Sequence, residues 1–250
     1  MSDLAASSGA NMTEVRAELG ADPAGSDLAL VRLLQLASPT LPIGAYSYSQ
    51  GLESVVADGI VHDAATAEAW VGDLLDLVVA KCDAPAVWRL LQACALERWA
   101  ELVEWNAWFR CSRETSELRA ETEQMGAALI RLASDLGLLD VGGSEAARAA
   151  APVTLPAAFA LAARGLGIGG GNAITAYLWS WLEGQVMTAM KVVPLGQVAG
   201  QRLQLRLGAR IPRIVASAKV IADDEMITFA PGLALASARH ETLYTRLFRS

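Results

Sequence analysis

The sequence predicts an all-α protein, a single-domain compact helical bundle of roughly eight to ten helices. Apolar residues recur at helical spacing in one segment after another. Proline and glycine stand between these segments, where they end one helix or begin the next. Long alternating runs of β-branched residues are absent from the sequence, and no fixed repeat indicates a solenoid. We expect three regions: a disordered extension over 1–26, a helical domain over 27–236 and a C-terminal docking segment over 237–250.

The first 26 residues are rich in alanine, serine, glycine and aspartate. They carry no sustained apolar period, so they cannot bury enough apolar surface to offset the entropy of ordering. A short helix near 12–19 is the only element that we expect there.

A bend between two helices is predicted over 38–50, which we call the elbow. Pro39 must end the first helix, because proline disfavours the helical conformation of the residue before it. A second amphipathic helix is expected to open at Ala45, from the spacing of Tyr48, Leu52, Val55 and Val56. The elbow combines backbone constraint with polar and aromatic side chains: Pro42, Gly44, Tyr46, Tyr48 and Gln50. It contains no His, Cys or Lys, so it suits recognition better than chemistry.

The middle of the chain predicts a series of helices. Gly59 closes the second helix, and Asp63 or Thr66 can cap a third that runs to about Cys82. The sequence Asp83-Ala84-Pro85 is typical of a new helix start, with an acceptor at the cap and proline in the first turn. From 101 to 136 the pattern is helical, with one short break near Cys111.

A polar connector rich in glycine and alanine is expected over 137–152, followed by a short helix over 157–164 and the glycine-rich segment 165–171. Asn172 is expected to cap a long helix that Pro194 ends. Two further helices are predicted over 195–207 and 211–221, and Asp223-Asp224-Glu225 is typical of a solvated turn.

Composition excludes several classes of protein. The net charge of −7 argues against nucleic-acid binding, which requires a basic surface. The most apolar window, 173–195, contains Glu183 and Lys191, which argues against a membrane span. With 53% hydrophobic residues and a mean hydropathy of +0.33, the chain either buries an unusually large fraction of itself or exposes apolar surface to partners. The chain has no basic residue before Arg16, which argues against a secretory signal peptide. Its three cysteines are an odd number without close spacing, which argues against a disulfide framework. We therefore expect a cytoplasmic protein.

Each candidate motif for catalysis or cofactor binding lacks a residue or a secondary-structure element that its chemistry requires. Gly165, Gly167 and Gly170 match G-x-G-x-x-G, but the segment before them is helical, whereas the dinucleotide fingerprint needs a strand. Neither His62 nor His240 has a cysteine or histidine at zinc-type spacing. We therefore expect no catalytic, cofactor-binding or metal-binding residues and no enzymatic activity.

One alternative is a helical enzyme that binds Mg²⁺ and a diphosphate through Asp73 and Asp76, one turn apart. It would require both carboxylates to face inward. The simpler interpretation is the polar flank of a core helix, because Leu74 and Leu75 lie between them.

Two sets of charged residues are candidates for partner contacts. Glu114, Glu117 and Glu121 are spaced to share one helical face with Arg119 near them, which favours a solvated charged face or a partner contact. Lys191 lies one turn before Pro194, where a lysine is favoured by the helix dipole or serves a function.

The last residues, RHETLYTRLFRS, are basic on an acidic protein. Their apolar residues Leu243, Tyr244, Leu247 and Phe248 are interleaved with arginines. Such a segment is suited to docking on another protein, although it could also fold back on its own domain.

Four ordered segments resemble the urease accessory protein UreF family: PTLPIGAYSYSQGLE, ETSELRAETEQMG, AYLWSWLEGQVMTAMKVVPLGQVAGQRL and HETLYTRLFRS. The resemblance covers nearly everything after about residue 28. It implies a non-catalytic, all-α, cytoplasmic and dimeric scaffold that binds UreD (also called UreH) and the GTPase UreG on apo-urease. Nickel and GTP would be handled by that complex and not bound by this chain. A scaffold for another metalloenzyme would share the fold and differ in its client.

The resemblance also implies site residues. The docking segment would contact UreD through Arg239, His240, Glu241, Tyr244, Arg246, Leu247, Phe248 and Arg249. The UreG-facing or dimer surface would include Pro42, Gly44, Tyr46, Tyr48, Gln50, Glu53, Glu114, Glu117, Arg119, Glu121, Lys191, Pro194, Gly196 and Gln197.

Overall fold

A computed structural model describes residues 23–250, and this part of the chain is helical throughout, without strands. The all-α prediction is confirmed. The α-helices are α2 (Pro23–Ala37), α3 (Leu52–Ala57), α4 (Ala64–Leu74), α5 (Ala84–Ala95), α6 (Trp99–Cys111), α7 (Ser116–Asp135), α8 (Val141–Ala149), α9 (Leu155–Gly165), α10 (Gly170–Val192), α11 (Gln197–Gly208), α12 (Ile211–Ala218) and α13 (Pro231–His240). Short 3-10 turns lie at Ala45–Ser47 and Asp223–Glu225. None of the described helices is both long and apolar enough to cross a bilayer.

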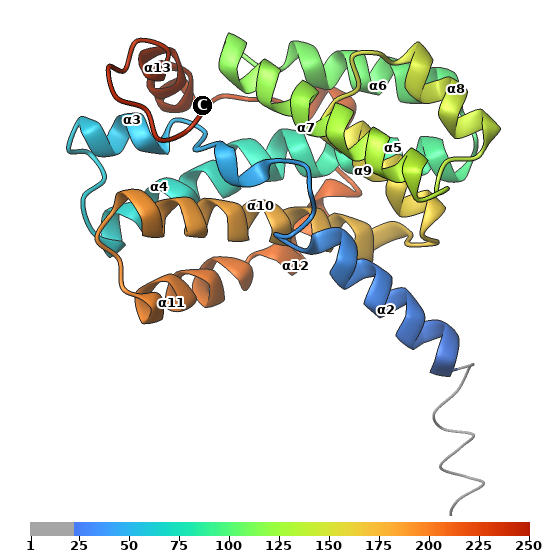
Figure 1. Ribbon diagram of the computed structural model, residues 1–250, viewed down its shortest axis with the longest axis horizontal. Coiled ribbons are helices and arrows are strands. Elements are labelled where there is room, and N and C mark those ends of the chain that lie inside the picture. The colour runs from blue at the N-terminus through green and yellow to red at the C-terminus, as the bar shows by residue number, and fades with distance from the viewer. Residues whose placement is uncertain (1–22) are drawn as a thin grey trace, which may run out of the picture.

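The long helix α10 runs through the middle of the molecule (Figure 1) and packs against α2, α3, α4, α5, α9, α11 and α12. Its side chains Ile174, Leu178 and Leu182 are completely buried. Every residue of α9 from Pro156 to Ala163 is buried as well. Two helices buried on nearly all sides account for much of the apolar composition, because such helices need no polar face.

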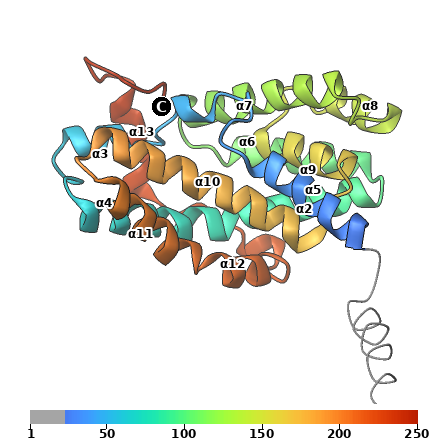
Figure 2. The ribbon, with the colours of Figure 1, turned by 60° about the horizontal axis from the view of Figure 1, so that its bottom comes forward.

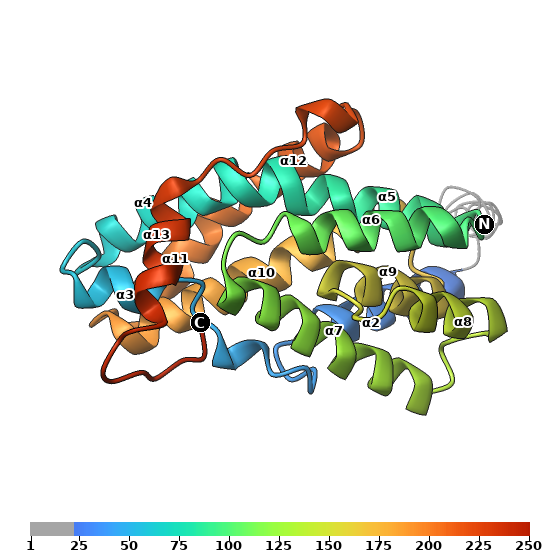
Figure 3. The same cartoon turned by 90° about the horizontal axis from the view of Figure 1, so that it is seen from above.

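The predicted break at Asp83 is wrong. A π-helical segment, Leu75–Asp83, joins α4 to α5, and the three form one continuous rod (Figure 3). Asp83 has a helical backbone and caps nothing; its side chain pairs with Arg113 at 3.0 Å in the interior. Pro85 stands in the first turn of α5, where the wider π turn before it tolerates a residue without an N–H donor.

Three other local predictions need correction. The second helix does not open at Ala45: a 3-10 turn comes first, and α3 begins only at Leu52. The connector over 137–152 contains α8, which Asp140 caps by accepting from the Gly143 N–H at 2.7 Å. The long helix begins at Gly170 with Gly169 at its cap, so Asn172 lies inside it. In each case a short polar or glycine-rich stretch carries too little periodicity to place a boundary.

Helix α2 begins at Pro23, inside the predicted extension over 1–26; the rest of that extension, with the predicted short helix at 12–19, lies outside the described residues. The C-terminal end of α2 packs on α10 through Leu36 and Ala37, while its other end leads away from the body (Figure 2). Leu28, Leu30, Val31 and Leu34 are largely exposed. The second predicted alternative, exposed apolar surface, is therefore found on α2.

Helix α13 packs against α3 and α7, and residues 241–250, which we call the tail, return from it to the elbow (Figure 3). The predicted boundary at 237 falls inside α13. The close approach of α3 to α13 depends on Gly51, which has φ +77° and lies where a Cβ atom would be 3.0 Å from that of Ala236. A larger residue there would be strained by both its backbone and its contacts.

Candidate partner-docking site

The elbow is held against α7 and α10 by Gln50 and Tyr48. The amide of Gln50 donates to Glu121 at 2.7 Å and accepts from the Trp181 indole N–H at 2.9 Å. The Tyr48 hydroxyl donates to the Gln124 side chain at 2.7 Å. Gly44, with φ +78°, gives the turn a conformation that other residues rarely adopt. Tyr46 remains exposed, and Pro42 is largely exposed beside it.

The carboxylates of α7 do not form the solvated face that we expected for them. Glu114 lies before the helix and is exposed, but Glu121 is buried and the side chain of Glu117 is only 12% exposed. Both point at the elbow and the tail, which supply their donors. Arg119 turns back to donate to the Arg113 carbonyl. Burial raises the pKa of Glu121 to about 7, against the donors Gln50 and Ser250, which lower it.

The tail is fastened to the elbow by main-chain hydrogen bonds. Its Arg249 N–H donates to the Ser47 carbonyl at 2.7 Å, and the Ser49 N–H donates to the carbonyl oxygen of Ser250 at 2.7 Å. Glu53, at the start of α3, accepts from the N–H groups of Leu247 at 2.6 Å and Phe248 at 3.0 Å. The tail therefore folds back on its own domain, the second of the two predicted alternatives.

Inward and outward residues alternate over the last four positions of the tail, 247–250. Phe248 and Ser250 are buried, whereas Leu247, Arg249 and Tyr244 are exposed, Tyr244 completely. Folding back thus orders the tail without hiding its outer side chains. The side chains of Tyr244 and Leu247 remain open to solvent on that outer side.

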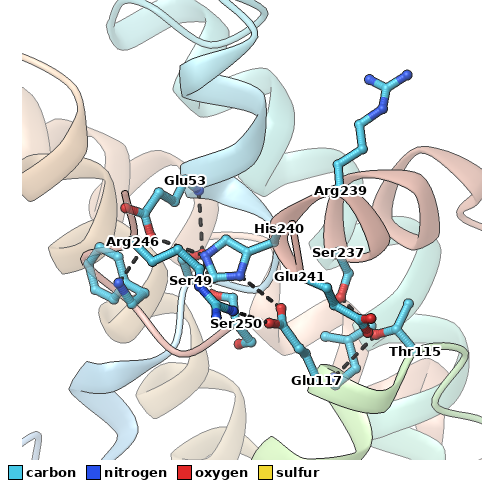
Figure 4. A network of polar contacts seen from close by, with 12 residues as sticks. Ser49, Glu53, Thr115, Glu117, Ser237, Arg239, His240, Glu241, Arg246 and Ser250 are labelled. Atoms are coloured by element: carbon cyan, nitrogen blue, oxygen red, sulfur yellow. Dashed lines mark hydrogen bonds and ion pairs between the residues drawn. The ribbon is translucent and has the colours of Figure 1, made fainter. Parts of the chain in front are cut away.

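His240, the last residue of α13, is completely buried between two helices (Figure 4). Its Nδ1 lies 2.8 Å from a carboxylate oxygen of Glu117, and its Nε2 lies 3.1 Å from one of Glu53. Arg246 donates to the other oxygen of Glu117 at 2.8 Å. Arg239 points away from this group and pairs with Asp58, while Glu241 accepts from Ser116.

The end of α10 reaches the same place. The Nζ atom of Lys191 lies 5.5 Å from the ring centre of Phe248, a cation–π distance. Pro194 and Gly196 lie in the exposed loop between α10 and α11, and the exposed Gln197 is the first residue of α11. Residues from all four of the quoted segments therefore meet around the tail, although the sequence separates them by up to about 200 positions.

A cavity of about 130 Å³ lies beneath the elbow. Apolar side chains form most of its wall, and its polar groups include Gln50, Glu121, Tyr177 and the Asp83–Arg113 pair. Burial raises the pKa of Tyr177 well above its usual range, so the phenol is neutral. The sequence did not point to the Asp83–Arg113 pair or to Tyr177, because no spacing rule joins the π-helical segment that ends at Asp83, the turn after α6 and the helix α10.

Comparison with known proteins gives the family. The model of the UreF family matches residues 61–208. "Urease accessory protein UreF" of Azoarcus sp. (strain BH72) is 52% identical over 234 residues, which is 93% of this chain and all of that protein. This chain belongs to the UreF family.

Other UreF proteins are similar over nearly the same length. That of Cupriavidus metallidurans is 49% identical over 88% of this chain and 97% of its own. A "Bifunctional urease accessory protein UreEF" of Bordetella bronchiseptica is 48% identical over 88% of this chain, which covers 52% of that longer protein. The predicted resemblance to UreF is confirmed, and these matches extend beyond the family model at residues 61–208.

The residues considered for catalysis or metal binding do not come together into a site in the described part of this UreF chain. Asp73 is exposed, and Asp76 is bound by Arg210 at 2.8 Å and Arg213 at 3.3 Å. Neither carboxylate faces inward, which contradicts the Mg²⁺-dependent alternative. His62 is exposed, far in sequence from the buried His240. Within residues 23–250 no group of three or more His, Cys, Asp or Glu residues is placed to hold a metal ion.

Proposed function

We propose that this UreF protein is a non-catalytic scaffold for assembly of the urease nickel centre. It bridges UreD (UreH) and the GTPase UreG on apo-urease, and it modulates GTP-dependent nickel delivery. Nickel and GTP are handled by the complex. We expect the assembly in the cytoplasm, where Cys82, Cys94 and Cys111 stay as thiols.

The observation that carries this proposal is the ordered tail with an exposed outer side. A docking peptide that is already ordered in the free protein loses less conformational entropy on binding. Tyr244 and Leu247 present apolar surface flanked by arginines, the composition that is enriched at protein interfaces. We assign this outer side to UreD.

The elbow and the Lys191 end of α10 are assigned to the surface that faces UreG or a second copy of the chain. The exposed residues there are Tyr46, Lys191, Pro194 and Gly196 of the following loop, and Gln197 at the start of α11. The exposed apolar side chains of α2 supply a second surface that suits a homodimer, because a patch of leucine and valine in water favours association.

Docking to UreD is tested by the double substitution Tyr244→Ala and Leu247→Ala. Both side chains are exposed, so we expect the tail to stay ordered and binding to purified UreD to weaken at least about tenfold. Leu205→Ala, an equally exposed leucine on α11, is the control. Unchanged affinity of the double variant would remove the tail from the UreD interface. A truncation after Arg239 is less informative, because it also removes the buried His240.

The role of Lys191 is tested by Lys191→Ala with Lys219→Ala as a matched control. Both lysines are exposed, and each Nζ lies 5.5 Å from an aromatic ring, Phe248 or Trp88. Loss of either contact costs about 0.5–1 kcal/mol of stability, so both variants should fold. We expect only Lys191→Ala to reduce GTP-dependent activation of urease. Equal activation by the two variants would take Lys191 out of the partner surface.

A further inference from the structure

The starting observation is that both ring nitrogens of His240 face carboxylate oxygens. Nδ1 lies 2.8 Å from Glu117 and Nε2 lies 3.1 Å from Glu53. A neutral imidazole carries one N–H and one lone pair, so it can satisfy only one of these contacts. The imidazolium donates at both nitrogens and satisfies both.

The proton cannot lie on the carboxylates instead. Glu53 also accepts from the main-chain N–H groups of Leu247 and Phe248, and Glu117 accepts from the Arg246 guanidinium. Donors of this kind favour the charged form of a carboxylate. Each glutamate thus accepts from donors other than the histidine, so the hydrogen-bond geometry assigns the remaining proton to His240.

The charges around the ring balance only with that proton in place. Glu53 comes from α3, Glu117 from α7 and Arg246 from the tail, and together with a protonated His240 they sum to zero. The next charged groups are occupied elsewhere: Arg239 pairs with Asp58. Glu241 accepts from the Ser116 hydroxyl, so it does not turn to the ring.

We propose that protonated His240 is a pH-sensitive fastener of the tail. Loss of one proton at high pH leaves a lone pair of the ring against a carboxylate and an uncompensated negative charge in a buried site. Glu53 then no longer holds the N–H groups of Leu247 and Phe248 in place, and this part of the tail detaches from α3. This inference rests on the proposed function in one respect: detachment would disperse the outer side chains that we assign to UreD.

The protonation state is measured directly by ¹⁵N NMR of the isolated full chain. The protein contains two histidines, and the exposed His62 provides an internal reference that His62→Gln identifies. At about pH 7 we expect both nitrogens of His240 to carry protons and to stay protonated as long as the tail is docked. A neutral His240 tautomer with the tail docked would overturn the proposal.

Detachment is followed by hydrogen exchange of the Leu247 and Phe248 amides as the pH is raised from about 6 to about 10. The intrinsic pH dependence of exchange is subtracted with the amides of α9 between Ala157 and Ala163, which are all buried. We expect protection of the two tail amides to be lost together with the His240 proton. Protection that persists after His240 is neutral would contradict the fastener.

Two substitutions separate the fastener from a structural role. Glu117→Gln removes one carboxylate and keeps a side chain of the same shape, so we expect detachment to move to lower pH. His240→Gln cannot lose a proton, so its tail should show no pH-dependent step, whether docked or free. An unmoved step in Glu117→Gln would overturn the proposal. These measurements involve no partner, so their failure is distinguishable from failure of UreD binding.

Discussion

Single buried residues hold the elbow, and Glu121 is the one whose charge matters most. It accepts from Gln50 of the elbow and from the Ser250 hydroxyl of the tail, in surroundings from which water is excluded. Burial disfavours its charged form and raises its pKa from about 4.5 to about 7. Glu121 therefore joins the elbow, α7 and the tail, and its contribution to the free energy of unfolding depends on pH.

The substitution Glu121→Gln tests this pH dependence of stability. A carboxyl with a raised pKa in the folded state stabilises it at low pH, and this contribution is lost as the pH rises from about 4.5 to about 7. The glutamine retains an acceptor for Gln50 and gains a donor for Ser250. We expect the free energy of unfolding of the variant, relative to the natural protein, to rise by about 3 kcal/mol between about pH 4 and about pH 8.

The measurement is urea unfolding at several pH values. Glu114→Gln, at an exposed carboxylate just before the same helix, is the control and should show a flat difference. A flat difference for Glu121→Gln too would mean that Glu121 is charged and well solvated in the fold.

Between elements, a close approach joins α7 to the segment before α9. Asn106 of α6 holds that segment by donating to the Ala150 carbonyl at 2.8 Å and accepting from the Thr154 N–H at 2.8 Å. Gly126 of α7 then lies so close that a Cβ atom would come within 2.1 Å of the Val153 carbonyl oxygen. Main-chain atoms cannot turn aside as a flexible side chain can.

Gly126→Ala should therefore destabilise the protein by about 1–3 kcal/mol or more, because overpacking outweighs the gain in helix propensity of about 1 kcal/mol. Gly184→Ala in α10 is the matched control, since nothing lies within 4 Å of its added methyl group. We expect the control to be neutral or up to about 1 kcal/mol more stable in thermal unfolding. Equal stability of the two variants would show that α7 and α9 can move apart freely.

At the scale of the whole molecule, α10 connects the elements around it. It contacts seven other α-helices, and its Leu182 is completely buried. The same helix contributes Trp181 and Gln185 to the elbow and Lys191 to the tail. A substitution that disrupts the packing of its core face should therefore also destabilise the elbow and the tail.

Leu182→Ala is expected to lower the free energy of unfolding by about 2–5 kcal/mol, the cost of a buried leucine plus the cavity left behind. Because one core spans the domain, circular dichroism and tryptophan fluorescence should report a single shifted transition. Two separated transitions would show instead that the predicted domain over 27–236 is divided.

The sequence by itself determined the helical class, most helix positions from 99 to 218 and the family. Those features depend on local periodicity, on helix-ending prolines such as Pro194 and on short ordered motifs, all of which are properties of neighbouring residues. It also singled out the tail, the elbow and Lys191, because each combines apolar and polar groups in a way that packing does not explain. It misplaced the start of α3 and the break at Asp83.

Only the tertiary structure decided where those pieces meet. Glu117 and Glu121 look like a solvated face in the sequence, because the donors that make their burial possible come from Gln50, Arg246 and Ser250, far along the chain. Asp83 looks like a helix cap because its partner Arg113 is 30 positions away. Burial of a charged group depends on partners that the fold delivers, and such partners leave no local pattern.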